Sequence, residues 1–153
     1  MQTISFSSDL PLKADVILAT LTMHGVNTEL RPLIRMTAPK AYSGRSILDW
    51  SEQQKLFDSW ILLFGCLPID RHSFYFDVID ENEGFSEHST SWTNKYWKHD
   101  RRVASQESGC RVVDTVRYKS RIPLVDLLLK PAYRLVFWLR HRNLRAKHVG
   151  QAT

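Results

Sequence analysis

Residues 84–118 decide the fold, and they read GFSEHSTSWTNKYWKHDRRVASQESGCRVVDTVRY. Within this stretch, residues 84–89, 96–103 and 114–118 alternate with the two-residue period of a β-strand. The residues that share one face of these strands are Phe85 and Glu87, then Trp97, His99 and Arg101, then Asp114, Val116 and Tyr118. Such a mixture of aromatic and ionisable side chains fills a core poorly, because buried charge is costly unless it is paired. It suits the wall of a cavity with a few polar groups, so the sequence predicts a pocket.

The chain before this stretch contains both strands and short helices. Residues 3–8 read as a first strand, and residues 13–23 and 26–31 have the spacing of two short helices. The apolar run 57–64 and the aromatic run 72–80 predict two further strands. Short turns join these strands to the ones that follow, which is typical of an antiparallel sheet.

Two further segments complete the predicted architecture. Residues 38–50 form the longest irregular stretch, and the segment 38–56 is expected to form part of the pocket rim. Ser51, with Gln54 three residues later, is expected to cap a helical turn. Residues 131–148 read as one long helix that begins at Pro131, where the missing backbone donor costs nothing. The order of elements predicts an α+β fold, in which a curved antiparallel sheet wraps around the C-terminal helix.

Composition and charge exclude several classes of protein. The 153 residues are 43% hydrophobic and 24% charged, which fits one compact domain over residues 1–153. The net charge of +5 comes from the segment after residue 129, which contains six basic residues and no acidic ones, so a general nucleic-acid surface is not expected. No apolar run is long enough for stable membrane insertion. Cys66 and Cys110 are expected to be buried free thiols, and no metal site or other cofactor is expected. The absence of a basic and then apolar start predicts a cytoplasmic protein.

Four short motifs in this chain resemble motifs of one protein family. In the order in which they occur, they are Gly84-Phe85-x-Glu87, Trp97-x-His99-x-Arg101, Asp114-x-Val116-x-Tyr118 and Phe137-x-x-Arg140-His141-Arg142. The chain resembles the START-like superfamily with its helix-grip fold, also called the SRPBCC or Bet v 1-like proteins. Within it, the chain looks like a bacterial branch that includes the N-terminal domains of epimerase-like fusion proteins. The resemblance implies a hydrophobic cavity that binds lipids, polyketides or other apolar molecules, and a minority of such proteins are cyclases or dehydratases.

The candidate ligand-binding residues combine an apolar wall with a polar group. They are Trp60, Phe64, Phe76, Phe85, Glu87, Trp97, His99, Arg101, Asp114, Val116, Tyr118, Phe137 and Arg140. The polar members either orient a ligand or form an ion cluster that only stabilises the sheet, and both alternatives predict that Arg101 contacts a carboxylate. Arg140 either crosses the cavity to Asp114 or Glu87, or extends to solvent at the end of its helix.

Three functions remain open at this point. The first is binding of a small, largely apolar molecule. The second is a cyclase or dehydratase in which His99 moves protons together with Asp114 or Glu87. The third is an interaction domain that works beside an oxidoreductase or forms a weak homodimer, which rests on analogy with the fused relatives alone.

Overall fold

The computed structural model describes residues 1–149, so the last four residues of the predicted domain, 150–153, lie outside the described part. Seven antiparallel strands form one sheet in the order β1-β7-β6-β5-β4-β3-β2. The strands are β1 (Gln2–Leu10), β2 (Ile34–Met36), β3 (Lys55–Leu63), β4 (Leu67–Asp80), β5 (Gly84–Ser91), β6 (Asn94–Gln106) and β7 (Gly109–Ser120).

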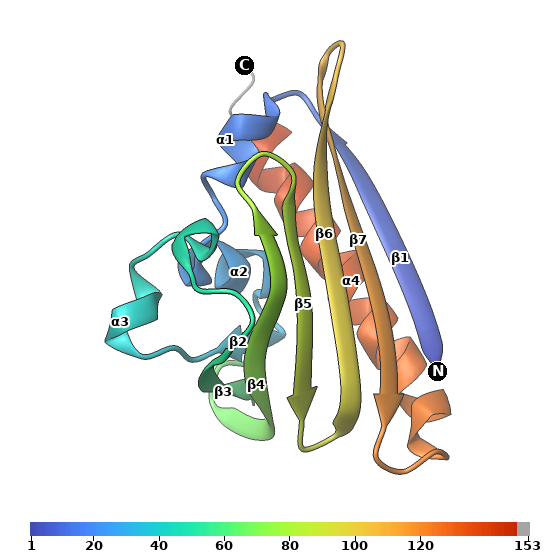
Figure 1. The fold of residues 1–153 in the computed structure, drawn as a ribbon. Coiled ribbons are helices and arrows are strands. Elements are labelled where there is room, and N and C mark those ends of the chain that lie inside the picture. The colour runs from blue at the N-terminus through green and yellow to red at the C-terminus, as the bar shows by residue number, and fades with distance from the viewer. Residues whose placement is uncertain (150–153) are drawn as a thin grey trace.

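One long helix, α4 (Val125–Val149), crosses a single face of this sheet (Figure 1). The short helices lie beside α4, towards the edge of the sheet formed by β2 and β3. The helices are α1 (Ala14–Leu18), α2 (Met23–Leu30), α3 (Lys40–Ser43), the 3-10 helix η1 (Ile47–Asp49) and α4 (Val125–Val149). The closest backbone contacts of α4 are with β1, β7 and α2. The predicted α+β helix-grip architecture is therefore confirmed, including the two short helices after the first strand.

The boundary between the two short helices differs from the prediction. The first helix, α1, ends at Leu18, whereas the prediction continued it to residue 23. The second begins at Met23 and not at residue 26, because the Thr22 hydroxyl accepts a hydrogen bond from the Gly25 amide at 3.0 Å. A threonine in that position is a helix N-cap, so Gly25 lies in the first turn of α2 and does not end the preceding helix.

The segment 38–56 is more regular than predicted, since it contains both α3 and η1. The cap expected at Ser51 is wrong: Ser46 caps η1 by accepting from the Leu48 amide at 3.2 Å. Gln54 directly precedes β3 and lies in no helical turn. The short strand β2 also escaped prediction, because three residues are too few to show a period.

The start of α4 is a further correction. The helix begins at Val125, and Pro131 lies inside it. Its first turn is tied to the sheet, because the Asp126 carboxylate accepts a hydrogen bond from the Ser120 amide at 2.6 Å. The chain thus enters the helix within a few residues of the end of β7, earlier than the proline suggested.

Two hydrophobic clusters hold these layers together. The larger one includes a group of aromatic rings in which Trp50 packs on Phe57, Phe74 and Phe76. The smaller one lies under α4 and consists of Ile4, Val116, Tyr118 and Phe137. Of the two free cysteines, Cys110 is buried as expected, but Cys66 is exposed, because it lies in the tight turn between β3 and β4.

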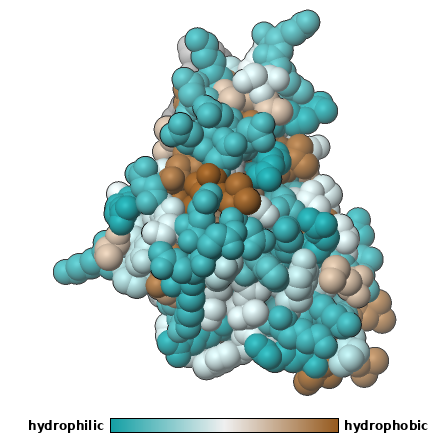
Figure 2. Space-filling view, viewed as in Figure 1, coloured by the Kyte–Doolittle hydropathy of each residue, from teal (hydrophilic) through white to brown (hydrophobic). Residues whose placement is uncertain are grey.

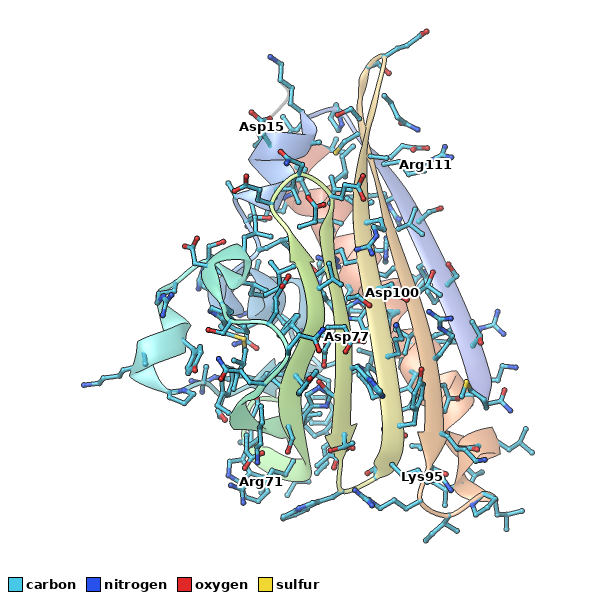
Figure 3. All side chains as sticks on the ribbon, viewed as in Figure 1. Asp15, Arg71, Asp77, Lys95, Asp100 and Arg111 are labelled. Atoms are coloured by element: carbon cyan, nitrogen blue, oxygen red, sulfur yellow. The ribbon has the colours of Figure 1, made fainter. Side chains whose placement is uncertain are left out.

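The outer face of the sheet is mainly hydrophilic (Figure 2). Its labelled acidic residues Asp77 and Asp100 belong to β4 and β6 (Figure 3). Asp100 accepts hydrogen bonds from neighbours on the same face, Ser86 and Arg117. The inner face, which α4 covers, therefore contains the buried residues that bear on function.

Candidate functional site

The three predicted rows of residues point inward, as expected. Phe85 and Glu87 are buried on β5, His99 and Arg101 on β6, and Asp114 on β7. Strand register places them side by side, with Glu87 opposite His99 and Arg101 opposite Asp114. The alternating pattern therefore identified the inner face and brought these ionisable groups together.

Gly84 fixes the start of this arrangement. Its φ is +126°, and a Cβ atom there would lie 2.3 Å from the carbonyl oxygen of Arg101. Only glycine fits so close an approach in that conformation. The turn into β5 consequently sets the register that pairs Glu87 with His99.

A cavity of about 500 Å³ lies between the sheet, α2 and α4. Most of its wall is apolar and comes from α2, β2, β4 and α4. Seven of the candidate residues line it: Phe76, Phe85, Glu87, Trp97, His99, Phe137 and Arg140. This volume and this mixture of residues are typical of sites for small organic molecules.

The structure places the other candidate residues elsewhere. Trp60 packs against Trp92 and Arg71 and does not line the cavity. Phe64 is 67% exposed, because β3 ends one residue earlier and the chain turns there. Arg101, Asp114, Val116 and Tyr118 are fully buried behind the cavity wall rather than on it.

Two histidines and one carboxylate, His72, His99 and Glu87, form one polar group on the wall. Glu87 Oε1 is 2.5 Å from His72 Nε2, and Glu87 Oε2 is 3.7 Å from His99 Nδ1. His99 Nε2 hydrogen-bonds to Asp114 Oδ1 at 2.8 Å, so both of its ring nitrogens face carboxylates. His72 makes only the bond to Glu87 among the described residues, which leaves its Nδ1 available on a residue that lines the cavity.

Asp114 anchors the layer behind this wall. It accepts hydrogen bonds from Arg101 at 2.6 and 2.8 Å, from His99 at 2.8 Å and from His141 at 3.0 Å. The prediction that Arg101 contacts a carboxylate is therefore confirmed. Because His141 belongs to α4, these bonds also attach the helix to β6 and β7.

Glu29 is a buried partner of the two arginines that sequence reasoning missed. It lies on α2 and accepts from Arg101 at 2.9 Å with each of its two oxygens. Arg140 donates to the same carboxylate at 2.9 and 3.1 Å, so the expected partners of Arg140, Asp114 and Glu87, are corrected to Glu29. An available signal was the position of an acid next to Leu30 on a helix that is otherwise apolar on that face.

His72 is a second residue that was missed although the sequence contained a signal for it. It belongs to the inward row that continues with Phe74 and Phe76, and that period was visible in the sequence. The row would have placed His72 beside the wall residues of β5.

The buried cluster comes close to electrical balance only if one histidine carries a proton. Three carboxylates, Glu29, Glu87 and Asp114, face the guanidinium groups of Arg101 and Arg140. Burial lowers the pKa of His99, but Asp114 and Glu87 outweigh burial and raise that pKa above its ordinary value. These two carboxylates therefore favour the protonated form of His99.

The carboxylates shift in the opposite direction. Burial raises the pKa of Glu87, but the adjacent His72 and His99 outweigh burial and hold the pKa well below its usual range. The pKa values of Glu29 and Asp114 are likewise lowered, since Arg101 outweighs the effect of burial on both. All three carboxylates thus stay charged at neutral pH.

Within residues 1–149, no group of three or more potential ligands is arranged to hold a metal ion. In the same part of the chain, no helix is long and apolar enough to span a bilayer. The arrangement provides an apolar cavity with a fixed polar group that can donate and accept hydrogen bonds.

The comparisons with known proteins agree with the fold. The aromatase/cyclase ZhuI from Streptomyces sp. R1128 superposes with a TM-score of 0.72 at 10% identity, covering 99% of this chain and 96% of that one. A START superfamily protein from Mycobacterium smegmatis gives a TM-score of 0.66 at 8% identity, covering 99% of both chains. The ginseng major latex-like protein 151 from Panax ginseng gives 0.64 at 13% identity, covering 96% of this chain and 97% of that one.

At such low identity these likenesses show the fold alone, and it is the START-like fold that the motifs suggested. No curated protein matches the sequence. A family match covers residues 8–148, nearly the whole described chain. The chain therefore belongs to the family described as Domain of unknown function (DUF8410), and its members' shared sequence is here folded as a START-like helix grip.

Proposed function

We propose that this protein binds a small, largely apolar molecule in the cavity between the sheet and α4. The observation that carries the proposal is the cavity itself, about 500 Å³ of space with a mostly apolar wall and one polar group. A hollow of this size is far larger than the packing defects of a protein interior, and it leaves apolar wall exposed to water. A ligand that fills it would remove that apolar surface from water.

The wall supplies most of the binding energy. Burying apolar surface contributes about 25 cal/mol per Å², so a ligand of lipid, polyketide or aromatic type gains most from contacts with residues such as Phe76, Phe85 and Phe137. The polar group orients it. His72 Nδ1 and the Arg140 guanidinium are two groups on the wall that can meet a ligand oxygen.

Native mass spectrometry of the protein purified from its own host tests the proposal. We expect a bound molecule that stays with the folded protein and leaves on denaturation. The variant Val26→Phe, which places extra volume in the cavity, should lose the molecule. Val16→Phe on exposed α1 is the matched control and should keep it.

A protein that carries no molecule and fails to bind any apolar fluorescent probe would refute the proposal. An equal amount of bound molecule in the Val26→Phe variant would place the binding outside the cavity. Circular dichroism of the wild type and of the Val26→Phe variant shows whether each protein is folded, and so separates both results from unfolding.

A catalytic role of the cyclase or dehydratase type is the second candidate, and one observation favours it. His72 and Glu87 form a buried dyad on the cavity wall, in which the carboxylate orients the imidazole. His99, the residue expected to move protons, has both ring nitrogens directed at carboxylates and is less suited to that task.

The variant His72→Gln separates the two roles. If His72 is an acid or base, the variant should bind the co-purified molecule normally and no longer convert it. If His72 is only an anchor, binding itself should weaken several-fold.

A further inference from the structure

A second group of polar residues lies on the cavity wall, away from the histidines. Asn94 begins β6 and is only 2% exposed, and Tyr133 reaches the same wall from α4. The Asn94 side-chain amide donates a hydrogen bond to the Tyr133 hydroxyl at 2.6 Å. The aromatic ring of Trp97 separates this pair from the histidines, since its centre is 5.2 Å from the Tyr133 ring and 5.9 Å from the His72 ring.

Both members of the pair have hydrogen-bonding capacity that no described residue uses. The side-chain oxygen of Asn94 is buried and has no partner within residues 1–149. The Tyr133 oxygen accepts from Asn94, but no described residue accepts the Tyr133 proton. Burial raises the pKa of Tyr133 to about 12, so this hydroxyl keeps its proton and can donate it. Buried polar groups left in this way are rare, and each requires an explanation.

The neighbouring Asp70 limits what can bind there. Its carboxylate already accepts from the amides of Arg71 and Thr93 and from the Ser91 hydroxyl. Asp70 also lines the cavity, and its negative charge acts on Tyr133. An anionic ligand group would be repelled at this end, whereas the oxygen of a neutral hydroxyl group can accept the unused Tyr133 proton.

We propose that Asn94 and Tyr133 form a polar subsite for a neutral hydroxyl group of the ligand. The ligand hydroxyl accepts a hydrogen bond from the Tyr133 hydroxyl, and the Asn94 amide holds that tyrosine hydroxyl in place. The ligand then carries polar groups at two positions, one at each side of Trp97, joined by an apolar part. This inference rests on the proposed binding function and adds to it the class of molecule, namely a hydroxylated apolar compound with a second polar group.

Two probes that differ by one hydroxyl test the subsite. Octanol and octane-α,ω-diol are each used to displace the apolar fluorophore N-phenylnaphthylamine from the protein, and the ratio of their dissociation constants is compared between variants. In Tyr133→Phe, which removes only the hydroxyl oxygen, we expect the preference for the diol to fall by about fivefold to tenfold, the worth of one buried hydrogen bond. Asn94→Leu should lower it similarly, because it removes the amide that holds the Tyr133 hydroxyl.

Tyr75→Phe is the matched control, because the Tyr75 hydroxyl bonds to Gln53 on the exposed side of the sheet. Its ratio should equal that of the wild type. Binding of both alcohols with a ratio that neither variant changes would overturn the subsite and leave the proposed function intact. Failure of the fluorophore and both alcohols to bind the wild type would instead remove the binding function, and the subsite with it.

Discussion

The two halves of the space between the sheet and α4 differ in how they are filled. The solid half, under β1, β7 and the far end of β6, contains Ile4, Val116 and Tyr118 and the Asp114 cluster, with no exposed side chain among them. The hollow half, bounded by β2 to β5, contains the cavity. α4 packs directly on β1 and β7 and touches β6 through Tyr133 and Phe137, whereas the cavity lies between α4 and strands β2 to β5.

The difference shows what each half contributes. Ion pairs of Arg101 and Arg140 with Glu29 join α2, β6 and α4 along the border between the halves. We infer that the solid half fixes the position of α4 and that the hollow half can therefore remain open. Four experiments would break or sharpen this distinction.

Arg101→Leu should have the largest effect. It leaves the buried carboxylates of Asp114 and Glu29 without their main partner, and we expect a loss of roughly 3–5 kcal/mol in the free energy of unfolding. Urea denaturation followed by circular dichroism measures it. Arg111→Leu is the control, because its pair with Asp9 is exposed and its loss should hardly change stability. Equal losses of stability in the two variants would show that the buried ion pairs of Arg101 do not stabilise the border between the two halves.

Arg140→Leu should cost less, about 1–3 kcal/mol, because Glu29 keeps both bonds to Arg101. The same denaturation experiment applies, with Arg142→Leu on the exposed side of α4 as the matched control. Unchanged stability in Arg140→Leu would mean that the ion pair with Glu29 does not stabilise the fold, and that Arg140 contributes to the cavity wall alone.

Added volume should distinguish the halves directly. Val116→Phe overpacks the solid half and should cost about 1–3 kcal/mol, whereas Val26→Phe extends into the cavity and should be nearly neutral. Thermal melting of both variants without ligand is sufficient. A similar loss in both would contradict the existence of the open half.

The pH dependence of stability should show the smallest effect. The pKa of His99 is raised in the folded protein, so its contribution is complete below its ordinary value of 6.5 and is lost as the pH rises through the folded value. The pKa values of Glu29, Glu87 and Asp114 are lowered, so their contribution is complete above about 4.5 and is lost at more acid pH. Stability should therefore be highest between these limits.

The variant His99→Gln isolates the alkaline side of this profile. It should lose the decline above pH 6.5 and keep the acid one. An identical alkaline decline in the variant would assign the extra proton to a different group.

The sequence predicted which side chains of the strands face inward better than it predicted the contacts between elements. Alternation in β5 to β7 is local, so it correctly placed Glu87, His99, Arg101 and Asp114 on one face. The partners from other elements are not local. Glu29 lies 72 residues from Arg101 and 111 from Arg140, and no period in the chain indicates such pairing.

The cavity wall was harder for a further reason. Whether an aromatic residue lines the space or leaves it depends on where a strand ends, and strand ends are the least regular part of a pattern. Phe64 lies one residue beyond β3 and turns to solvent, while Phe76 stays inside β4 and reaches the wall.

The long-range bonds of Asp114 and Glu29 have a kinetic consequence. They join residues that must be brought together from distant parts of the chain, and closing such loops is slow. Asp114 on β7 needs both β6 and α4 for its bonds, and Glu29 on α2 needs the same two elements, so these four elements should open and close as one unit in amide hydrogen exchange.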